Sequence, residues 1–240
     1  MDVRFLPAGD TALVVEFGDR IDRALSDRVL QLSQRIRVDR LPGVTETVPT
    51  FRSLMVHYDP TATNGARLVS EIRARIGDSE ARTHRCRLWR LPACYAPSFA
   101  PDLVSVAERT GLAPQEVVRR HAQTQFHVYM IGFTPGCPYM GDLPPELHLP
   151  RRVDPRMRVP SGSIAIAAGL SIIYPAESPG GWHLIGATPV QLFDPRSKRP
   201  SLLAPGDAVR FEPVGLDDYA AIHAAIAGNR YTAVSKEIDE

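Results

Sequence analysis

The chain has 240 residues, of which 44% are hydrophobic and 23% charged, a composition that is typical of a globular protein and excludes a fibrous or disordered one. Its 28 basic and 27 acidic residues give a formal net charge of +1, which leaves no charge excess for nucleic acid or an anionic membrane surface. The longest nearly apolar stretch, residues 164–176, is broken by glycine and proline and is shorter than the about 20 residues of a membrane-spanning helix. The N-terminus lacks the basic region and apolar core of a signal peptide, so we expect a cytoplasmic protein.

The first eighty residues alternate between strand and helix patterns. Runs of strand-forming residues that end at turn signals predict strands at residues 3–6, 11–17, 44–48 and 54–58. Apolar residues at three- and four-residue steps predict helices at residues 21–36 and 64–77. The order β-β-α-β-β-α predicts a small α+β sandwich lobe over residues 1–80, with one antiparallel sheet covered by two helices.

A polar and charged run at residues 78–87 is the predicted linker to a second domain over residues 88–240. The predicted elements of this domain are a strand at 88–94, helices at 101–109 and 114–123, short strands and turns from 126 to 211, and a helix at 216–227 before a polar tail. Short strands with a turn about every 8 to 12 residues predict a closed or nearly closed β-barrel.

Proline is unusually frequent and is concentrated in one part of the chain. Of the 22 prolines, 12 lie between residues 131 and 200, together with 8 of the 17 glycines. The same stretch contains many isoleucine and aromatic residues, so we interpret it as short strands joined by rigid turns. Three of its segments, residues 131–143, 158–169 and 174–186, carry groups suited to binding or catalysis.

The first segment is a loop whose shape proline and glycine restrict. It presents Phe133 and Tyr139 on either side of Pro135. These aromatic side chains form either the preorganised wall of a ligand pocket or the core of a barrel corner.

The second segment contains the hydroxyl-rich turn Pro160-Ser161-Gly162-Ser163. Its backbone N–H groups and two hydroxyls can bind a carboxylate or phosphate, with Arg158 as the counter-charge. An ordinary hairpin turn with an exposed arginine is the alternative. The chain has no GxxxxGK[ST] sequence, so a classical P-loop does not hold ATP here.

The third segment exposes consecutive backbone N–H groups before a strand. Its candidate binding residues are Tyr174, Glu177, Ser178, Pro179, Gly180, Gly181 and Trp182. The tryptophan supplies a large contact surface with one donor. His183, which follows it, is a candidate acid or base at neutral pH, and a satisfied core or surface histidine is the alternative.

The remaining titratable groups give weaker signals. His121 ends the helix predicted at 114–123, where a protonated imidazole suits the helix dipole. Three cysteines without CxxC spacing and seven histidines without an HxxxH or HExxH pair predict no metal site, and Cys137 is expected to be a small buried thiol.

The three segments also carry a family resemblance. The sequences GFTPGCPYMGDLP, RVPSGSIAIA and YPAESPGGWHLIGATP, followed by LFDP and LAPGDAVRF, closely resemble the 5-oxoprolinase B-subunit family. This family is also described as allophanate hydrolase subunit 1-like or as the carboxyltransferase C-D domain, and it includes the kinase inhibitor KipI. Similar motifs extend upstream almost to the N-terminus.

The resemblance implies a cyclophilin-like β-barrel after the N-terminal lobe and a role as an enzyme subunit. Such a subunit pairs with a C subunit and an A subunit, and the complex uses ATP and water to convert 5-oxo-L-proline to L-glutamate, ADP and phosphate. ATP, with magnesium, is expected to bind at a site shared with the partner. Two alternatives remain within the family: a KipI-like protein that inhibits a histidine kinase, and a subunit of an allophanate- or urea-type hydrolase or carboxylase.

Together, the residue chemistry and the resemblance assign a candidate site. The predicted catalytic residues are His183, Ser161 and Arg158. The predicted substrate- and ATP-binding residues are His121, Phe133, Pro135, Tyr139, Pro160, Gly162, Ser163, Tyr174, Glu177, Ser178, Pro179, Gly180, Gly181 and Trp182. Three positions depart from the usual family pattern, since Cys137, Leu170 and His183 replace other residues there.

Overall fold

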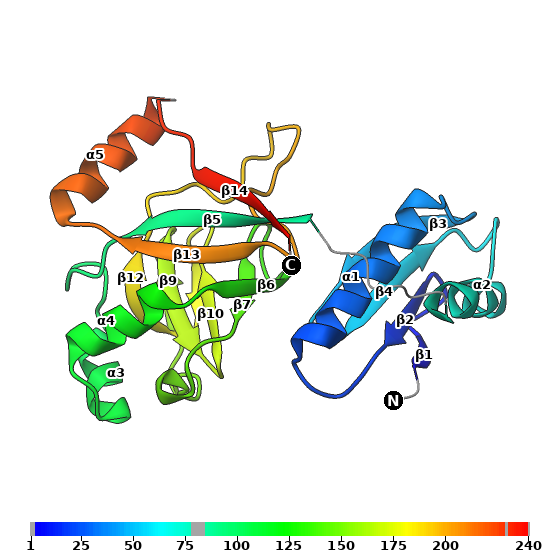
Figure 1. Cartoon of the computed structure of the whole chain (residues 1–240), viewed down its shortest axis with the longest axis horizontal. Helices are drawn as coiled ribbons and strands as arrows, with labels where there is room; N and C mark the ends of the chain where they lie inside the picture. Colours follow the sequence, from blue (N-terminus) through cyan, green and yellow to red (C-terminus); the bar gives the residue numbers. More distant parts are fainter. Residues whose placement is uncertain (1–2, 78–84, 229, 240) are drawn as a thin grey trace. The chain divides into compact units, whose positions relative to one another are not determined.

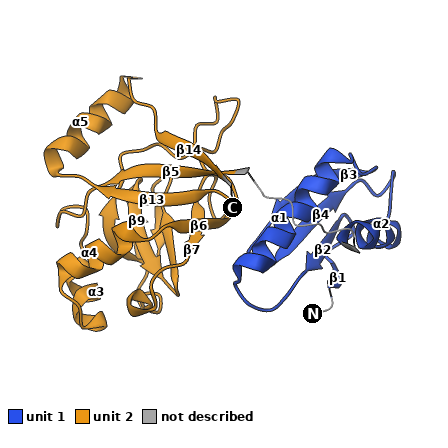
Figure 2. Cartoon of the chain, viewed as in Figure 1, with its two compact units in different colours: residues 1–85, 239–240 blue, residues 86–238 orange. Residues whose placement is uncertain are grey.

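Two compact units make up the chain. The structure, a computed structural model, describes residues 3–77, 85–228 and 230–239 (Figure 1). One unit covers residues 1–85 with 239–240 and the other covers residues 86–238 (Figure 2). Most of the predicted linker, at residues 78–84, lies outside the described residues, and its last three residues belong to a strand. Within the described ranges, the helices are too short or too polar to cross a bilayer.

The first unit contains one antiparallel sheet and two helices. Its elements are β1 (Arg4–Pro7), β2 (Ala12–Glu16), α1 (Arg23–Val38), β3 (Val44–Pro49), β4 (Ser53–Tyr58) and α2 (Gly65–Gly77). The strand order is β1-β2-β4-β3, and every neighbouring pair is antiparallel. This arrangement agrees with the sheet and the two helices that the sequence predicts.

Capping groups and apolar spacing explain the two helices of this unit. The Asp22 carboxylate accepts a hydrogen bond from the Leu25 N–H at 3.3 Å, and Asn64 Oδ1 accepts one from the Arg67 N–H at 2.9 Å. The buried apolar residues of both helices form one core cluster with those of β2 and β4, which include Val15 and Leu54. One apolar stripe per helix therefore covers the sheet.

The second unit is larger and contains most of the strands. It begins with β5 (Arg85–Ala93), α3 (Leu103–Thr110), α4 (Pro114–Gln123), β6 (Phe126–Ile131), β7 (Pro138–Gly141) and the short 3₁₀ helix Pro145–Leu147. It continues with β8 (Arg156–Val159), β9 (Ser163–Ala167), β10 (Leu170–Ile173), β11 (Ser178–Gly180), β12 (His183–Ala187), β13 (Ala208–Pro213), α5 (Leu216–Ala227) and β14 (Val234–Asp239).

Eight of these strands form one sheet in the order β12-β9-β10-β7-β6-β13-β5-β14. β13 runs parallel to β5, whereas the pairs from β13 through β6, β7, β10 and β9 to β12 are antiparallel. Strands β8 and β11 pair only with each other, as a separate two-stranded sheet. The unit's core lies between this framework and helices α3 and α4, which contribute Val106 and Val117.

The cyclophilin-like closed barrel is not confirmed, because none of the described sheets closes on itself. A single isolated bridge between Cys94 and Ala187 joins the residue after β5 to the end of β12, with N–H···O distances of 2.8 and 2.9 Å. Turn spacing along the sequence indicates how many strands form, but closure of a barrel depends on the long-range register between strands. Here β8 and β11, which lie in the predicted barrel region, pair with each other and not with the large sheet.

The C-terminal segment differs from its prediction in one respect. Helix α5 has the predicted bounds, although none of its residues is buried. The predicted polar tail instead forms strand β14 at the edge of the large sheet. Charged residues are tolerated in β14 because an edge strand keeps one side in water.

Candidate functional site

Aromatic side chains from two of the three predicted segments meet in the second unit. Tyr139 on β7 and Trp182 just before β12 pack edge to face, with ring centroids 6.0 Å apart. The guanidinium carbon of Arg151 lies 5.6 Å from the Trp182 ring centroid, which is a cation–π distance. Tyr174 follows β10, the strand that pairs with β7. We call Tyr139, Tyr174, Trp182 and Arg151 the aromatic cluster.

The backbone near Trp182 is shaped around Tyr174. A Cβ added at Gly180 would collide with the Tyr174 hydroxyl, so only glycine fits at this position of β11. The Tyr174 side chain is 1% exposed, and burial raises the pKa of its hydroxyl to about 12. Tyr174 is therefore protonated at neutral pH and presents a hydrogen-bond donor.

Three donors of the aromatic cluster have no protein partner within the part of the chain that the structure describes. They are the Tyr174 hydroxyl, the indole N–H of Trp182 and the guanidinium of Arg151. Tyr174 and Trp182 are nearly buried. These donor atoms remain accessible from solvent, and together they suit a ligand that is rich in oxygen, such as a carboxylate, a carbonyl compound or a phosphate.

A buried carboxylate holds the loop that carries Arg151. Asp102, which precedes α3 and is 4% exposed, accepts two hydrogen bonds from Arg156 at 2.7 and 2.8 Å and one from Arg152 at 3.1 Å. It also accepts the backbone N–H of Leu184 on β12 at 2.7 Å. Burial raises the pKa of the Asp102 carboxyl, but the hydrogen bonds from Arg156 and Leu184 and the arginine charges outweigh burial and leave this pKa below its ordinary value.

The sequence predictions missed Asp102 and the arginines at 151, 152 and 156. The signal for the arginines was present, since residues 151–158 contain four of them in a chain of nearly neutral charge. No local pattern marks Asp102, because its partners lie 50 and 54 residues further along the chain.

The second and third predicted segments are bound to each other. The Gly162 N–H donates to the Tyr174 carbonyl oxygen at 2.7 Å, and the Ser161 hydroxyl donates to the Pro175 carbonyl oxygen at 2.9 Å. Arg158 donates to both carboxylate oxygens of Glu177 at 2.9 and 3.1 Å, and the two side chains are 78% and 53% exposed. The charge of Arg158 is thus paired with Glu177 at the surface, and the Ser161 hydroxyl holds a turn.

His183 is buried and already hydrogen-bonded. Its Nε2 lies 2.9 Å from the Pro150 carbonyl oxygen and 3.3 Å from an Arg109 guanidinium nitrogen. A carbonyl oxygen only accepts, so Nε2 carries the proton and donates to Pro150. In this geometry His183 positions the loop beside the aromatic cluster, and its acid–base role remains a prediction.

His121 lies in the core of the second unit. Its Nδ1 is 2.9 Å from the Tyr95 hydroxyl and its Nε2 is 3.0 Å from Ser171 Oγ, while its ring stacks on Phe211 with centroids 4.8 Å apart. Burial lowers the pKa of His121 to about 3, so the imidazole is neutral. The protonated imidazole expected from the helix dipole is therefore wrong, because desolvation outweighs the dipole at this position.

The other predicted residues divide into exposed and structural positions. Phe133 is 61% exposed and has a positive φ of 68°. Among the predicted site residues, Pro135, Pro160 and Pro179 are exposed as well. Ser163 is buried on β9, Gly181 precedes Trp182, and the Ser178 hydroxyl is buried without a hydrogen-bond partner. Of the predicted site residues, the structure brings together Tyr139, Tyr174, Gly180 and Trp182, while binding roles for the rest remain predictions.

A metal site requires several ligating side chains that lie close together. Within the described residues, no three His, Cys, Asp or Glu side chains are placed to hold a metal ion. Cys137 is buried, and burial raises the pKa of its thiol to about 12, so it is a neutral thiol. The prediction that this chain has no metal site of its own stays a prediction.

Comparison with known proteins assigns the family. Residues 3–203 match the model of the carboxyltransferase domain, subdomain C and D. The chain belongs to this family. It is also 38% identical to the 5-oxoprolinase B subunit of Escherichia coli O157:H7 over 205 residues, which cover 85% of this chain and 93% of that protein. The corresponding protein of Bacillus subtilis strain 168 is 36% identical over 226 residues, covering 89% of this chain and 93% of that protein.

Solved structures confirm the resemblance at the level of the fold. The crystal structure of TTHA0988 is 34% identical with a TM-score of 0.76, and the match covers 86% of this chain but only 40% of that longer one. The urea amidolyase of K. lactis gives a TM-score of 0.83 at 22% identity over 99% of this chain and 16% of its own, which shows a shared fold. The predicted membership in the 5-oxoprolinase B-subunit family is confirmed by the family model and the curated relatives.

Proposed function

We propose that this chain is the B subunit of a 5-oxoprolinase, which acts with an A subunit and a C subunit to open 5-oxo-L-proline to L-glutamate at the expense of ATP. The observation that carries this proposal is the 38% identity to the Escherichia coli protein, which extends over 93% of that protein. A match of this length includes the whole framework that holds the aromatic cluster. More distant relatives are named urea amidolyase, so urea-type substrates belong in the test.

The chemistry of 5-oxo-L-proline suits the aromatic cluster. This substrate is a small, flat ring with a carboxylate and a lactam carbonyl, both of which accept hydrogen bonds. Arg151 supplies the positive charge for the carboxylate, and Tyr174 and Trp182 supply neutral donors for the carbonyl oxygen. The faces of Tyr139 and Trp182 can pack against the ring. The cluster would therefore bind and orient the substrate and stabilise negative charge on its carbonyl oxygen.

ATP is needed because a lactam is a stable amide. Transfer of the γ-phosphoryl group to the lactam carbonyl oxygen would break its bond to ADP and leave an activated carbon, which water attacks as the C–N bond opens and phosphate departs. The described residues include no P-loop, and we propose that ATP, with magnesium, binds at a site shared with the partner chain. Within this chain, Tyr174 and Trp182 are nearly buried, so they would exclude bulk water while leaving the attacking water molecule in place.

The test is reconstitution of the three-subunit complex. This chain is co-purified with its A and C partners, and glutamate and phosphate are measured with 5-oxo-L-proline, urea and allophanate as substrates. We expect glutamate release that requires ATP and stops when any one of the three chains is omitted. If the complete mixture consumes urea or allophanate but not 5-oxo-L-proline, the substrate assigned to this chain is wrong. If it consumes none of the three compounds, the enzymatic role is refuted.

Variants of the aromatic cluster locate the site within the complex. Trp182→Ala should lower kcat/KM by about 10- to 100-fold, because the substrate loses a packing surface and Arg151 loses its cation–π support. Tyr219→Ala removes an aromatic side chain from α5, a helix that has no buried residues and no part in the predicted site, so it serves as the matched control. Equal activities of the two variants would place the site elsewhere.

A further inference from the structure

The segment at residues 150–159 contains the arginine of the aromatic cluster and is fixed to the rest of the second unit. The Pro150 carbonyl oxygen accepts a hydrogen bond from His183 at 2.9 Å, and the Arg152 N–H donates to the Gly181 carbonyl oxygen at 2.7 Å. The last four residues of the segment form β8, which pairs with β11. We call residues 150–159 the anchored segment, because its backbone is held in place before any partner binds.

Two apolar side chains of the anchored segment project into solvent. Val153 is 94% exposed and Met157 is 84% exposed, the highest values for large apolar side chains among the described residues. Single exposed apolar residues are common on protein surfaces, but these two lie four positions apart on one fixed segment next to the candidate site. Because the backbone is already ordered, a protein that covers them loses little conformational entropy on binding.

Charged residues of both signs adjoin these apolar side chains along the chain. Asp154 follows Val153 and is exposed, and Arg158 follows Met157 and is ion-paired with Glu177 at the surface. An anionic membrane surface or a nucleic acid favours positive charge without acidic neighbours. An apolar centre within a rim of mixed charge is instead typical of a protein–protein interface, in which methionine is also enriched.

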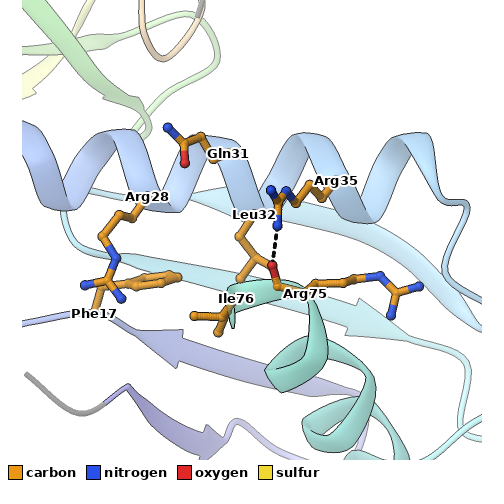
Figure 3. A pocket seen from close by; sticks show the side chains of 7 residues that line it. All are labelled: Phe17, Arg28, Gln31, Leu32, Arg35, Arg75 and Ile76. Atoms are coloured by element: carbon orange, nitrogen blue, oxygen red, sulfur yellow. Dashed lines mark hydrogen bonds between the residues drawn. The ribbon is translucent and has the colours of Figure 1, made fainter. Parts of the chain in front are cut away.

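The candidate site indicates which protein covers this surface. The donor atoms of the aromatic cluster remain accessible from solvent, so a partner that shares the ATP site can reach them from that side. The chain has no P-loop sequence. The hollow between α1 and the end of α2 in the first unit has a volume of about 20 Å³, room for about one water molecule and far too little for a nucleotide (Figure 3). A partner that shares the ATP site therefore has to contact this chain beside the aromatic cluster, where the anchored segment lies.

We infer that the anchored segment is the docking surface for the C subunit, which covers Val153 and Met157 with an apolar recess and completes the ATP site beside the aromatic cluster. The inference rests on the proposed function, since that function supplies the partner. The recess has to accept one branched and one long, unbranched side chain. Its edge has to offer groups of both charge signs, for Asp154 and for Arg158.

The test is binding of the full chain to the C subunit, measured by isothermal titration calorimetry. The double variant Val153→Ser/Met157→Thr should raise the Kd about 100-fold or more, because polar groups replace both apolar contacts. Threonine keeps the strand propensity of β8. Since both side chains are exposed in the free chain, the variant should keep the circular dichroism spectrum and Tm of the unmodified chain.

The matched control makes the same two substitutions at other exposed apolar positions. Val38→Ser/Val234→Thr changes side chains that are 70% and 58% exposed and lie outside the anchored segment, one at the end of α1 and one on β14. The Kd of this variant should stay within about 3-fold of that of the unmodified chain.

Hydrogen exchange locates the interface on the unmodified chain, so the question is decided even if a variant fails to fold. Addition of the C subunit should slow amide exchange in peptides that cover residues 150–159. Peptides that cover α5 serve as the internal reference and should be unaffected.

The outcomes separate this inference from the proposed function. Equal Kd values for the two double variants, or slowed exchange that leaves out residues 150–159, would overturn the inference while the proposed function stands. No binding between the unmodified chain and the C subunit would refute both. Self-association of the chain that Val153→Ser/Met157→Thr abolishes would assign the surface to a second copy and also overturn the inference.

Discussion

The buried carboxylate of Asp102 offers the most direct test of how the candidate site is built. In Asp102→Asn the side chain keeps its shape and retains an oxygen that can accept the Leu184 N–H, but the negative charge is lost. Arg152 and Arg156 then face each other without a counter-charge, and an amide N–H₂ group replaces one of their acceptors. The expected result is a less stable second unit with a displaced loop beside the aromatic cluster.

The size of the effect follows from the burial of the three side chains. Removal of one partner from a buried ion pair costs about 3–5 kcal/mol. The Asp102 side chain is 6% exposed, whereas those of Arg152 and Arg156 are 30% and 25% exposed. Water therefore partly solvates and screens the two arginine charges that lose their counter-charge. We therefore expect a loss of about 3 kcal/mol, at the lower end of that range, and a Tm lower by about 6–12 °C for a unit of this size.

Tryptophan fluorescence is a suitable assay, because both tryptophans of the chain, Trp89 and Trp182, are buried in the second unit. Denaturant unfolding followed in this way reports the unit that contains Asp102. Asp154→Asn is the matched control, since this exposed aspartate lies in the loop that carries Arg151 and Arg152, and its carboxylate has no ion pair within the described residues. Free energies of unfolding that agree within about 0.5 kcal/mol for the two variants would refute the reasoning.

The same variant gives a pH-dependent signature. The pKa of Asp102 is lower in the folded chain than its ordinary value, so its contribution to stability is present above the unfolded pKa of about 3.9 and is lost as pH falls through the folded pKa. The difference in unfolding free energy between the unmodified chain and Asp102→Asn should therefore be largest at neutral pH and shrink in acid. A difference that grows in acid would contradict the assignment.

Three further predictions concern other parts of the second unit. Gly162→Ala should destabilise it by about 3 kcal/mol, because φ is +81° and the new Cβ would collide with the Thr188 carbonyl oxygen, whereas Gly111→Ala, with a φ of +68° and open space, should cost only about 1 kcal/mol in denaturant unfolding. His121 has its pKa lowered to about 3 by burial, so its NMR signals should not titrate between about pH 5 and 8, and a midpoint near its ordinary value would disprove its burial. Cys137, whose thiol pKa burial raises to about 12, should resist alkylation in the native chain and react once the chain is unfolded.

The candidate site was predictable where proline, glycine and aromatic residues define it locally. Tyr139, Tyr174 and Trp182 were all among the predicted binding residues, because each lies in a segment whose backbone is restricted by its own sequence. Arg158 and Glu177 are predicted to act on a ligand, but Arg158 on β8 binds Glu177, the residue just before β11, which pairs with β8. Pairing of this kind depends on strand register, which the sequence of either segment does not specify.

Local sequence patterns determined the elements of this protein. The helix at residues 216–227 and the four strands and two helices of the first unit follow from periodicity, capping groups and turn residues, which act within a few positions of the chain. The tertiary structure alone decided which distant groups meet. Asp102 acquires Arg152 and Arg156, and the strands form an open sheet, because such contacts arise from long-range packing and charge compensation between segments that are tens of residues apart.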